Sequence, residues 1–287
     1  MRRALVTGAT SFPGLALVER LVAEGVEVHA VVRPTTRTEA LVHLGVRLHL
    51  DGHLPAVVAE AKPDVAWHLA NNYLREHKAA DIPALIDANV TFGTRLVDAL
   101  HGTGCAFVNV GTFAQYPTPL NLYAATKEAF ETVLAHYREL GMPATTLVLY
   151  DTYGPGDTRR KLVPTLLAAL AEGAAPIPLP AEELVMDLTY RNDVAEALLV
   201  AGRGIKANPA AWTGKRFAAS GFRHPIAEVV ATFEAVAGRQ VPKTIGGWVL
   251  PERIIRIPWH GPRLPGWEPH ISLAEGLRRT LEAHRAG

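Results

Sequence analysis

Short runs of β-branched and other apolar residues alternate with longer amphipathic stretches along the first half of the chain. Six of these runs predict strands, at residues 3–7, 27–32, 46–50, 64–69, 106–110 and 145–150. The stretches between them predict helices at residues 13–24, 55–61, 83–100 and 122–140. This alternation is typical of βαβ units, so we expect an α/β fold with a doubly wound parallel sheet, that is, a Rossmann fold.

The pattern changes after residue 150, where prolines and glycines become frequent. Strands are only weakly indicated there, at residues 183–188 and 216–219. A helix is expected over residues 192–201, capped by Asn192 and with Asp193 in its first turn, and a last helix should begin near Ser272. We therefore predict a first domain over residues 1–150 and a smaller lobe over residues 151–287. The lobe should be discontinuous, with residues 188–201 returning to the first domain.

Composition narrows the choice of partners. The 29 Lys+Arg and 28 Asp+Glu residues leave a net charge of +1, which argues against a nucleic-acid binder. The single cysteine, Cys105, excludes an intramolecular disulfide and is expected to be a small buried apolar residue. The first apolar run, residues 4–6, is far shorter than a signal-peptide core, and no run approaches the ~18 apolar residues of a membrane span. We expect a cytoplasmic protein with no membrane partner.

A glycine-rich turn follows the first predicted strand and opens the first predicted helix, with the sequence Thr7-Gly8-Ala9-Thr10-Ser11-Phe12-Pro13-Gly14. In a dinucleotide-binding turn, Gly8 would permit the tight bend and Gly14 the close approach of the helix, whose N-terminus would face a pyrophosphate. Ser11 replaces the middle glycine of the usual pattern and could cap the helix. An ordinary strand-to-helix turn is the alternative, because a glycine motif alone is weak evidence.

The end of the second predicted strand bears on the choice of cofactor. Folds that prefer NAD place an acidic residue there to bind the ribose 2′-hydroxyl. This chain has Arg33 at that position, followed by Arg37, and no carboxylate before Glu39. Guanidinium groups bind a 2′-phosphate, so we predict NADP(H) in preference to NAD(H). The alternative is that both arginines are solvated loop residues.

Tyr123 and Lys127 lie four residues apart on one predicted helix, and therefore on one face of it. A phenol with a pKa near ~10 is a poor acid–base catalyst at neutral pH, but a nearby cation stabilises the phenolate. Thr112 follows the strand predicted at residues 106–110, and ligands of doubly wound sheets bind at the carboxyl ends of the strands. The three residues are therefore candidates for one catalytic site.

These features in this order resemble the extended branch of the short-chain dehydrogenase/reductase superfamily, the NAD-dependent epimerase/dehydratase type, over nearly the whole chain. The strings around Tyr123 and Tyr153 are most similar to nucleotide-diphospho-4-keto-6-deoxyhexose reductases, such as CDP-abequose and CDP-paratose synthases. Four further segments support the resemblance: residues 64–70, 89–94, 153–157 and 193–197.

The resemblance implies that Tyr123 donates a proton, that Lys127 binds the nicotinamide ribose and lowers the Tyr123 pKa, and that Thr112 hydrogen-bonds the reacting carbonyl. The implied cofactor-binding residues are Gly8, Thr10, Ser11, Phe12, Pro13, Gly14, Arg33, Arg37, Asp51, Gly52, Leu69, Ala70, Asn71, Val110, Tyr123, Lys127, Leu149 and Thr152. The implied substrate-binding residues are Asn72, Thr112, Phe113, Tyr150, Asp151 and Lys161.

The same resemblance separates the possible reactions. Dehydratases of this branch carry an Asp-Glu pair after the catalytic hydroxyl residue, whereas Thr112 is followed by Phe113 and Ala114, which cannot transfer protons. Dissociable NADPH suits a 4-ketoreductase of a nucleotide-diphosphate sugar, which we expect. A 4-epimerase with bound NAD and a non-catalytic NADP(H)-sensing protein are the alternatives. The resemblance also implies a homodimer formed by the helices at residues 83–100 and 122–140.

One departure concerns the substrate diphosphate, because Met186 stands where the family commonly has an arginine. Five cations are candidate replacements: Arg159, Arg160, Lys161, Arg253 and Arg263. We expect no metal site, because His43, His49 and His53 fall in different predicted elements without a ligand pattern. His68 ends an apolar strand and is expected to pack there.

Overall fold

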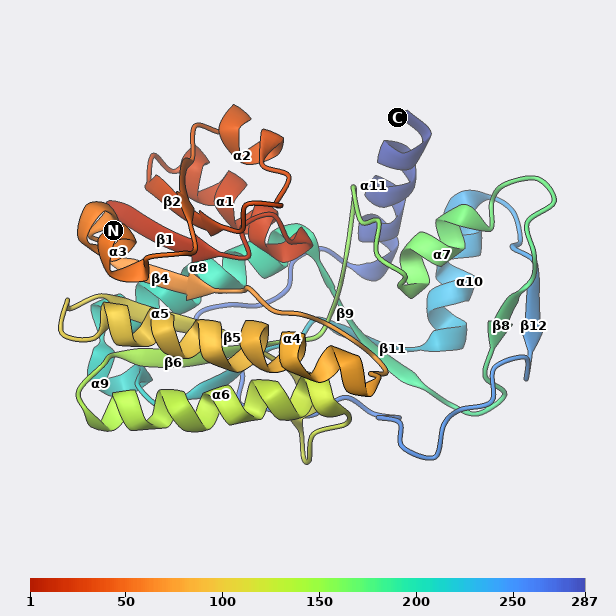
Figure 1. Ribbon diagram of the computed structural model, residues 1–287. Helices are drawn as coiled ribbons and strands as arrows, with labels where there is room; N and C mark the ends of the chain where they lie inside the picture. The colour runs from red at the N-terminus through yellow and green to blue at the C-terminus, as the bar shows by residue number, and fades with distance from the viewer. Residues whose placement is uncertain (287) are drawn as a thin grey trace. The chain divides into compact units, whose positions relative to one another are not determined.

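The computed structural model describes residues 1–286 (Figure 1), so Gly287, the last residue of the predicted lobe, lies outside the described residues. The chain forms two compact units. Unit 1 comprises Met1–Leu149, Val194–Ala219 and Trp259–Trp267, and unit 2 comprises Tyr150–Asp193, Ser220–Pro258 and the chain from Glu268 onward. The segment expected to return to the first domain, residues 188–201, corresponds to Val194–Ala219, so it begins later and is longer. A second segment that belongs to unit 1, Trp259–Trp267, is not indicated by the sequence. Leu264 and Trp267 of that second segment are buried in the unit 1 core.

Unit 1 is built on a parallel sheet. Within the described residues it has seven strands in the order β10-β6-β5-β4-β1-β2-β3. The strands are β1 (Arg3–Thr7), β2 (Glu27–Val32), β3 (Arg47–Leu50), β4 (Val65–His68), β5 (Ala106–Thr112), β6 (Ala144–Leu149) and β10 (Arg216–Ala219). The strand order changes direction between β1 and β4, which confirms the doubly wound α/β fold and places a ligand site at the carboxyl ends of those strands.

Helices cover both faces of this sheet. On one face α1 (Phe12–Ala23) and α8 (Arg191–Ala207) pack against alternate strand residues such as Val6 and Trp67. On the other, α3 (Leu54–Ala61), α5 (Phe92–Leu100) and α6 (Leu122–Glu139) pack against the intervening residues, such as Leu5 and Phe107. Figure 1 shows α5 and α6 side by side on this second face. Successive side chains of a strand point to opposite faces of the sheet. Because helices cover both faces, the residues on each face are buried.

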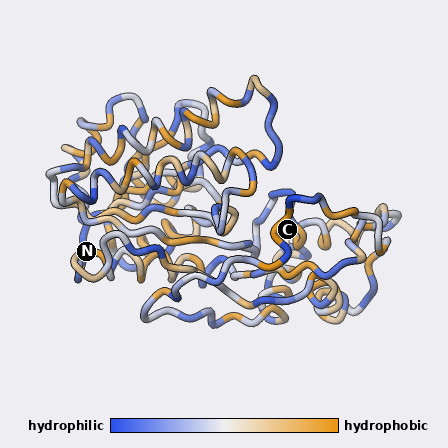
Figure 2. Tube along the Cα trace, turned by 90° about the horizontal axis from the view of Figure 1, so that it is seen from below, coloured by the Kyte–Doolittle hydropathy of each residue, from blue (hydrophilic) through white to orange (hydrophobic). Residues whose placement is uncertain are grey.

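The predicted helix at residues 83–100 is interrupted. It consists of α4 (Ile82–Ile86), a π-helical turn over Asp87–Thr91 and then α5, preceded by a 3₁₀ turn at Ala79–Asp81. Unit 1 also contains the short helices α2 (Glu39–His43) and α9 (Pro209–Trp212), and a 3₁₀ turn at Phe113–Gln115. In Figure 2, hydrophobic and hydrophilic positions alternate around the helical turns, as expected for helices with one buried side.

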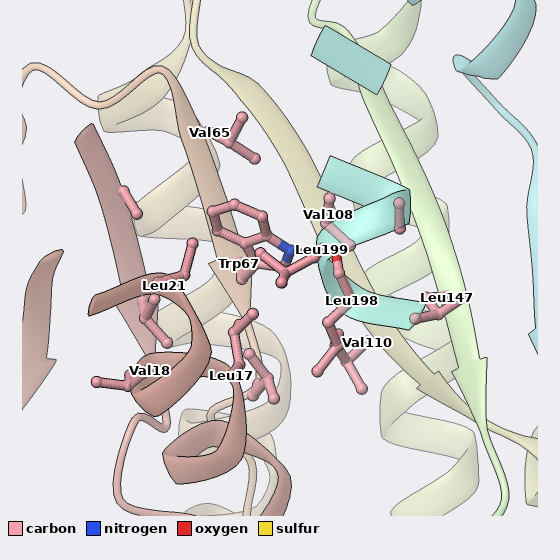
Figure 3. Packing of buried hydrophobic residues seen from close by; sticks show 14 of the residues in the cluster. Leu17, Val18, Leu21, Val65, Trp67, Val108, Val110, Leu147, Leu198 and Leu199 are labelled. Carbon is pink, nitrogen blue, oxygen red and sulfur yellow. Dashed lines mark hydrogen bonds between the residues drawn. The ribbon is translucent and has the colours of Figure 1, made fainter. Parts of the chain in front are cut away.

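Trp67 joins the sheet to α8. Its indole is fully buried, and Nε1 donates a hydrogen bond to the Leu198 carbonyl oxygen over 2.8 Å. Figure 3 shows the ring between Leu17 and Leu21 of α1 and Leu198 and Leu199 of α8. A Cβ atom on Gly202 would lie 2.1 Å from the indole, so α8 can pack this closely only with glycine there. This packing explains why residues beyond 194 belong to unit 1.

Unit 2 has short strands and three helices in its described residues. The strands β7 (Asp151–Tyr153), β9 (Val185–Tyr190) and β11 (Phe222–Pro225) form one sheet, and β8 (Ile177–Leu179) pairs with β12 (Lys243–Ile245). The helices are α7 (Leu162–Ala168), α10 (Ile226–Ala237) and α11 (Leu273–Ala286). Of these strands only β9 was anticipated, because runs of three or four residues between prolines and glycines carry little periodicity.

Two predicted helix starts in this part of the chain have different outcomes. The helix expected at Asn192 begins at Arg191 and continues to Ala207, so Asn192 is not its cap. Asp193 is buried, and its carboxylate accepts hydrogen bonds from the His270 and Ile271 amides over 3.2 and 3.0 Å. The cap predicted at Ser272 is confirmed, because its hydroxyl accepts from the Glu275 amide over 3.4 Å. None of the helices in the described range is long and apolar enough to span a bilayer.

Candidate active site

The glycine-rich turn between β1 and α1 is shaped by steric limits at two positions. Gly8 has a φ of +68°, and a Cβ atom there would lie 2.6 Å from the Ala70 amide nitrogen. A Cβ atom on Gly14 would lie 2.1 Å from the Gly8 carbonyl oxygen. Ser11 is the N-cap of α1 as predicted, since its hydroxyl accepts from the Gly14 amide over 3.2 Å. Only glycine fits these two positions, and the N-terminus of α1 is held beside the ends of β1 and β4.

A cavity of about 590 Å³ opens at this edge of the sheet. It is lined by the glycine-rich turn, the carboxyl ends of β2, β3 and β4, and one side of α4, the π-helical turn and α5. Its charged lining residues are Arg33, Arg95, Asp51 and Asp87. The volume, the helix N-terminus and the two glycines fit a dinucleotide, because a pyrophosphate can then approach backbone N–H groups closely.

Many of the residues that the family resemblance implied for the cofactor line this cavity. They are Gly8, Thr10, Ser11, Arg33, Asp51, Gly52, Leu69, Ala70 and Asn71, joined by the predicted substrate residue Asn72. Phe12, Pro13, Gly14, Arg37, Val110, Tyr123, Lys127 and Leu149 of unit 1 are not among its lining residues, and Thr152 belongs to unit 2. Both predicted arginines are exposed, and of the two Arg33 lines the cavity whereas Arg37 does not.

The helical wall of the cavity was missed by sequence reasoning. Ala84, Ala88, Phe92 and Arg95 line it. Their spacing of three or four residues is that of one helix face, so the helical periodicity of residues 83–100 could have identified them. Arg95 is held in place because its Nη2 donates to the Gly52 carbonyl oxygen over 3.1 Å. A second cation therefore lies beside the turn that follows β3.

Tyr123 and Lys127 lie one helical turn apart on α6, and both are buried. Asn121 caps the helix just before them, accepting from the Ala124 amide over 3.0 Å. Burial raises the pKa of the Tyr123 phenol well above its ordinary value, and Tyr73, whose ring meets it edge-on at 4.9 Å, raises it further. This direction is opposite to the lowering by Lys127 that the sequence led us to expect. The phenol is therefore held protonated at neutral pH.

Lys127 itself is perturbed by its surroundings. Its side chain is 2% exposed, and burial lowers the pKa of its ammonium to about 8, against the opposing effect of Glu131. Lys127 in turn acts on His68, whose pKa is lowered to about 3 by burial and, to a smaller degree, by the Lys127 charge. His68 is fully buried among the rings of Phe92, Phe107 and Phe130, as expected for a packing residue.

Asn89 connects the cofactor edge to the helix that carries Tyr123. It lies in the π-helical turn and is fully buried. Its Oδ1 accepts from the Asn72 amide over 2.7 Å, and its Nδ2 donates to the Asn72 carbonyl over 3.0 Å and to the Thr126 hydroxyl over 2.9 Å. Thr126 then donates to the Tyr123 carbonyl over 2.7 Å. π-Helical turns are frequent at functional sites, and here the turn directs an amide between two site segments.

Thr112 ends β5 and caps the following 3₁₀ turn. Its hydroxyl oxygen accepts from the Ala114 amide over 3.3 Å, and its own amide donates to the Gln115 side-chain oxygen over 2.8 Å. The hydroxyl keeps its own proton as a donor, which a group that polarises a carbonyl needs. Phe113, the other predicted substrate residue here, is partly buried in the same turn.

The predicted substrate residues of unit 2 interact with their neighbours in that unit. Lys161 donates to the Asp151 carboxylate over 2.9 Å. Arg159 is tied to Asp157 over 2.7 Å and to the Thr152 carbonyl over 2.7 Å. Both candidate cations are thus held by unit 2 itself.

Arg223 is a further cation of unit 2, which sequence reasoning missed. Its strand β11 pairs with β9, which carries Met186. Nε of Arg223 lies 2.9 Å from the Asp187 carboxylate, and the guanidinium lies 5.8 Å from the Tyr150 ring centroid. No motif marks Arg223 because the pairing of two distant strands brings it to Tyr150.

The histidines set aside at the sequence level lie apart from these groups. His49 is hydrogen-bonded to His29, with 2.8 Å between ring nitrogens, and lies 3.7 Å from Glu60. Within residues 1–286, no group of three or more His, Cys, Asp or Glu side chains is arranged to hold a metal ion. Cys105 is buried as expected, and burial raises the pKa of its thiol to about 12.

Comparison with known proteins agrees with this geometry. The model of the NAD dependent epimerase/dehydratase family matches residues 4–211. The chain belongs to this family. Its members are extended short-chain dehydrogenases/reductases, and membership indicates an NAD(P)-dependent enzyme.

Individual family members are similar over different lengths. A UDP-glucose 4-epimerase of Mycolicibacterium smegmatis is 29% identical, covering 99% of this chain and 98% of its own length. A CDP-abequose synthase of Salmonella typhimurium is 27% identical, covering 68% of each chain. Among solved structures, a UDP-glucuronic acid 4-epimerase from Bacillus cereus, in complex with UDP-glucuronic acid and NAD, superposes with a TM-score of 0.81 at 20% identity. That superposition covers 100% of this chain and 99% of the other and shows the shared fold.

Proposed function

We propose that the protein uses NADPH to reduce the C4 ketone of a nucleotide-diphospho-4-keto-6-deoxyhexose. The observation that carries the proposal is Arg33, which lines the dinucleotide cavity at the end of β2. A guanidinium there favours a 2′-phosphate, and NADPH that binds and dissociates suits a net reduction. The similarity of residues over two thirds of the chain to a CDP-abequose synthase supports the same class of substrate.

The cofactor would lie along the cavity, with its pyrophosphate at the glycine-rich turn. Asp51 and Gly52 would border the adenine, and Arg33 would bind the 2′-phosphate. Leu69 and Ala70 would flank the part of the cofactor that leads from the pyrophosphate to the nicotinamide. NADPH supplies the hydride for C4 when it is bound. The residues of this chain would supply the proton and stabilise the charge that develops on the C4 oxygen.

Tyr123 would donate the proton that the C4 oxygen needs as its negative charge develops. Its phenol is protonated at neutral pH, as an acid must be before it donates. The ammonium of Lys127, one turn away on the same helix, would stabilise the phenolate left behind. Thr112, whose hydroxyl oxygen accepts from the Ala114 amide, would donate a hydrogen bond to the same oxygen. Lys127 would contact the nicotinamide ribose and place a positive charge near the developing alkoxide. Phe113 and Ala114 offer no acid or base for a dehydration.

The substrate would also need contacts from unit 2. Tyr150, Asp151 and Lys161 are our proposed sugar-nucleotide residues there. Because Met186 carries no charge, the diphosphate requires another cation, and we assign Lys161 and Arg223 to it. Both are cations that neighbouring carboxylates already hold in defined positions. A cation that is already held in place binds phosphate oxygens with little further loss of side-chain entropy, and the guanidinium of Arg223 can bind two of them at once.

A 4-epimerase that retains NAD is the second candidate, favoured by the full-length similarity to a UDP-glucose 4-epimerase. Several solved neighbours of the same fold contain NAD. An epimerase must first remove a proton from the C4 hydroxyl, which requires a phenolate at Tyr123. The same phenol would donate the proton in the reductase, so Tyr123 is required in both candidates.

The two candidates are separated by one set of assays. NADPH oxidation is followed at 340 nm with freshly prepared dTDP- or CDP-4-keto-6-deoxyglucose. Turnover that falls about 10²–10⁴-fold in Tyr123→Phe supports the reductase. Tyr137→Phe is the matched control, because Tyr137 lies on the same helix and bonds Asp98 over 3.0 Å. Isomerisation of a UDP-hexose without added NADPH, and no oxidation of NADPH, would instead support the epimerase.

We also propose that the chain is a homodimer. Ile82 and Ile86 of α4 are 39% and 41% exposed, which is high for isoleucines on the helices expected to form the interface. Pairing these helices with those of a second copy would remove both side chains from water.

A further inference from the structure

A polar network beneath the sheet edge leads away from the turn that carries Thr112. The amide of Thr112 donates to the side-chain oxygen of Gln115 over 2.8 Å. Gln115 is 2% exposed, and its Nε2 donates to Glu128 Oε2 over 2.8 Å. Glu128 follows Lys127 on α6. The conformation of the Thr112 turn therefore depends on a carboxylate of the helix that carries Tyr123.

Arg216, on the edge strand β10, holds that carboxylate. Its Nη2 donates to Glu128 Oε1 over 3.0 Å, and its Nη1 lies 3.4 Å from Oε2. Its Nε lies 3.4 Å from Oε2 of Glu131, a fully buried residue one turn beyond Lys127. A planar guanidinium can bridge two carboxylates in fixed directions, which the ammonium of a lysine cannot.

Glu131 has further partners in unit 1. Its Oε1 accepts from Asn109 Nδ2 over 2.5 Å and from the Thr146 hydroxyl, and its Oε2 lies 3.3 Å from Arg138 Nη1. The two carboxylates and two guanidiniums balance in charge. Because Glu131 also opposes the effect of burial on the pKa of Lys127, the same network acts on the site at Thr112 and at Lys127.

Arg216 also fixes the segment that follows Thr112 through Tyr116. Its Nη1 donates to the Tyr116 hydroxyl over 3.2 Å. The Tyr116 ring stacks on Trp259, with 4.1 Å between ring centroids and 18° between planes. Trp259 begins the second returning segment of unit 1. Two side chains remote in sequence thus hold the connection between Thr112 and Tyr123.

We propose that Arg216 is a positioning residue for catalysis, which sets the direction of the Thr112 hydroxyl through Glu128 and Gln115. This inference rests on the proposed function in one respect, the contact between Thr112 and the reacting oxygen. Arg216 itself is not among the residues that line the dinucleotide cavity. Displacing a catalytic group by ~1 Å can lower a rate about 10²-fold, so loss of this support should be visible in kcat.

The test compares Arg216→Met, Arg216→Lys and the control Arg203→Met, which removes an exposed ion pair to Glu24. Amide hydrogen exchange of the peptide spanning residues 108–118 is measured by mass spectrometry, without substrate. We expect faster exchange of that peptide in Arg216→Met, less change in Arg216→Lys, and none in Arg203→Met. Peptides of β1 and β2 should exchange as in the wild type in all three variants.

Kinetics provide the second readout. Arg216→Met should lower kcat about 10-fold or more, with the Kd for NADPH unchanged. Unchanged exchange of residues 108–118, or an unchanged kcat in a folded variant, would overturn the proposal. If Arg216→Met fails to fold, Gln115→Met replaces it, because it removes the link to Thr112 without removing a charge. If the wild type reduces no 4-keto sugar, the proposed function fails, while the exchange measurement still shows whether Arg216 orders the turn that carries Thr112.

Discussion

Replacing Lys127 by methionine should stabilise the fold while destroying activity. The ammonium of Lys127 is 2% exposed, and its pKa is about 8 instead of the ordinary 10.5 because burial disfavours the charged form. A pKa difference of one between the folded and the unfolded chain corresponds to about 1.4 kcal/mol of stability. Keeping this lysine charged in the folded state therefore costs about 3 kcal/mol at neutral pH. Methionine fills a similar volume without a charge, and removal of a buried charge in this way is often stabilising.

The stability advantage of Lys127→Met over the wild type should decrease as the pH rises. Below pH 8 the lysine is protonated in both the folded and the unfolded chain, and the full cost is present. Between pH 8 and 10.5 the unfolded chain binds more protons, so the wild type gains stability as pH rises. The advantage of Lys127→Met should therefore be about 3 kcal/mol at pH 7 and fall below about 1 kcal/mol at pH 10.

The measurement is urea unfolding of the wild type and of Lys127→Met at pH 7, 8.5 and 10. Lys215→Met is the matched control, because the Lys215 side chain is exposed, and its effect should stay within about 0.5 kcal/mol at every pH. A Lys127→Met variant that is less stable than the wild type at pH 7, or an advantage that does not change with pH, would refute the reasoning.

Three further outcomes are expected. Because the pKa of buried His68 is about 3 instead of 6.5, stability should fall by up to about 5 kcal/mol as pH drops from 6.5 to 3, and His68→Leu should remove most of this loss in acid unfolding curves. Arg33→Asp should weaken NADPH binding about 10-fold or more and strengthen NADH binding in fluorescence titrations; tighter binding of NADH by the wild type would contradict the NADP assignment. Ile86→Glu should convert a dimer to a monomer in sedimentation velocity, and an unchanged sedimentation coefficient would place the interface elsewhere.

Local pattern was sufficient for the parts of the site that lie in one stretch of chain. The turn from Gly8 to Gly14 was predictable because steric limits on a strand–turn–helix unit leave a fixed glycine spacing. Arg33 was predictable because the end of β2 has a fixed place relative to that turn in a doubly wound sheet. The shared helix face of Tyr123 and Lys127 follows from helical periodicity alone.

Several other features depended on contacts between distant segments. The direction of the Tyr123 pKa is one of them, because burial and the nearby Tyr73 phenol raise it, whereas the spacing along the helix predicted a lowering by Lys127. The weak strands of unit 2 are another, since three-residue strands are stabilised by their neighbours and not by their own sequence.

The amino-acid sequence by itself determined the α/β fold, the cofactor turn and the identity of the candidate catalytic groups. It did so because backbone sterics and hydrophobic periodicity act over a few residues. Only the tertiary structure decided which charges surround those groups. Arg223 reaches Asp187 because β11 pairs with β9, and Arg216 reaches Glu128 of α6 because β10 pairs with β6, the strand that follows that helix. Electrostatic effects depend on distance in space and on burial, and both are fixed only when the strands assemble.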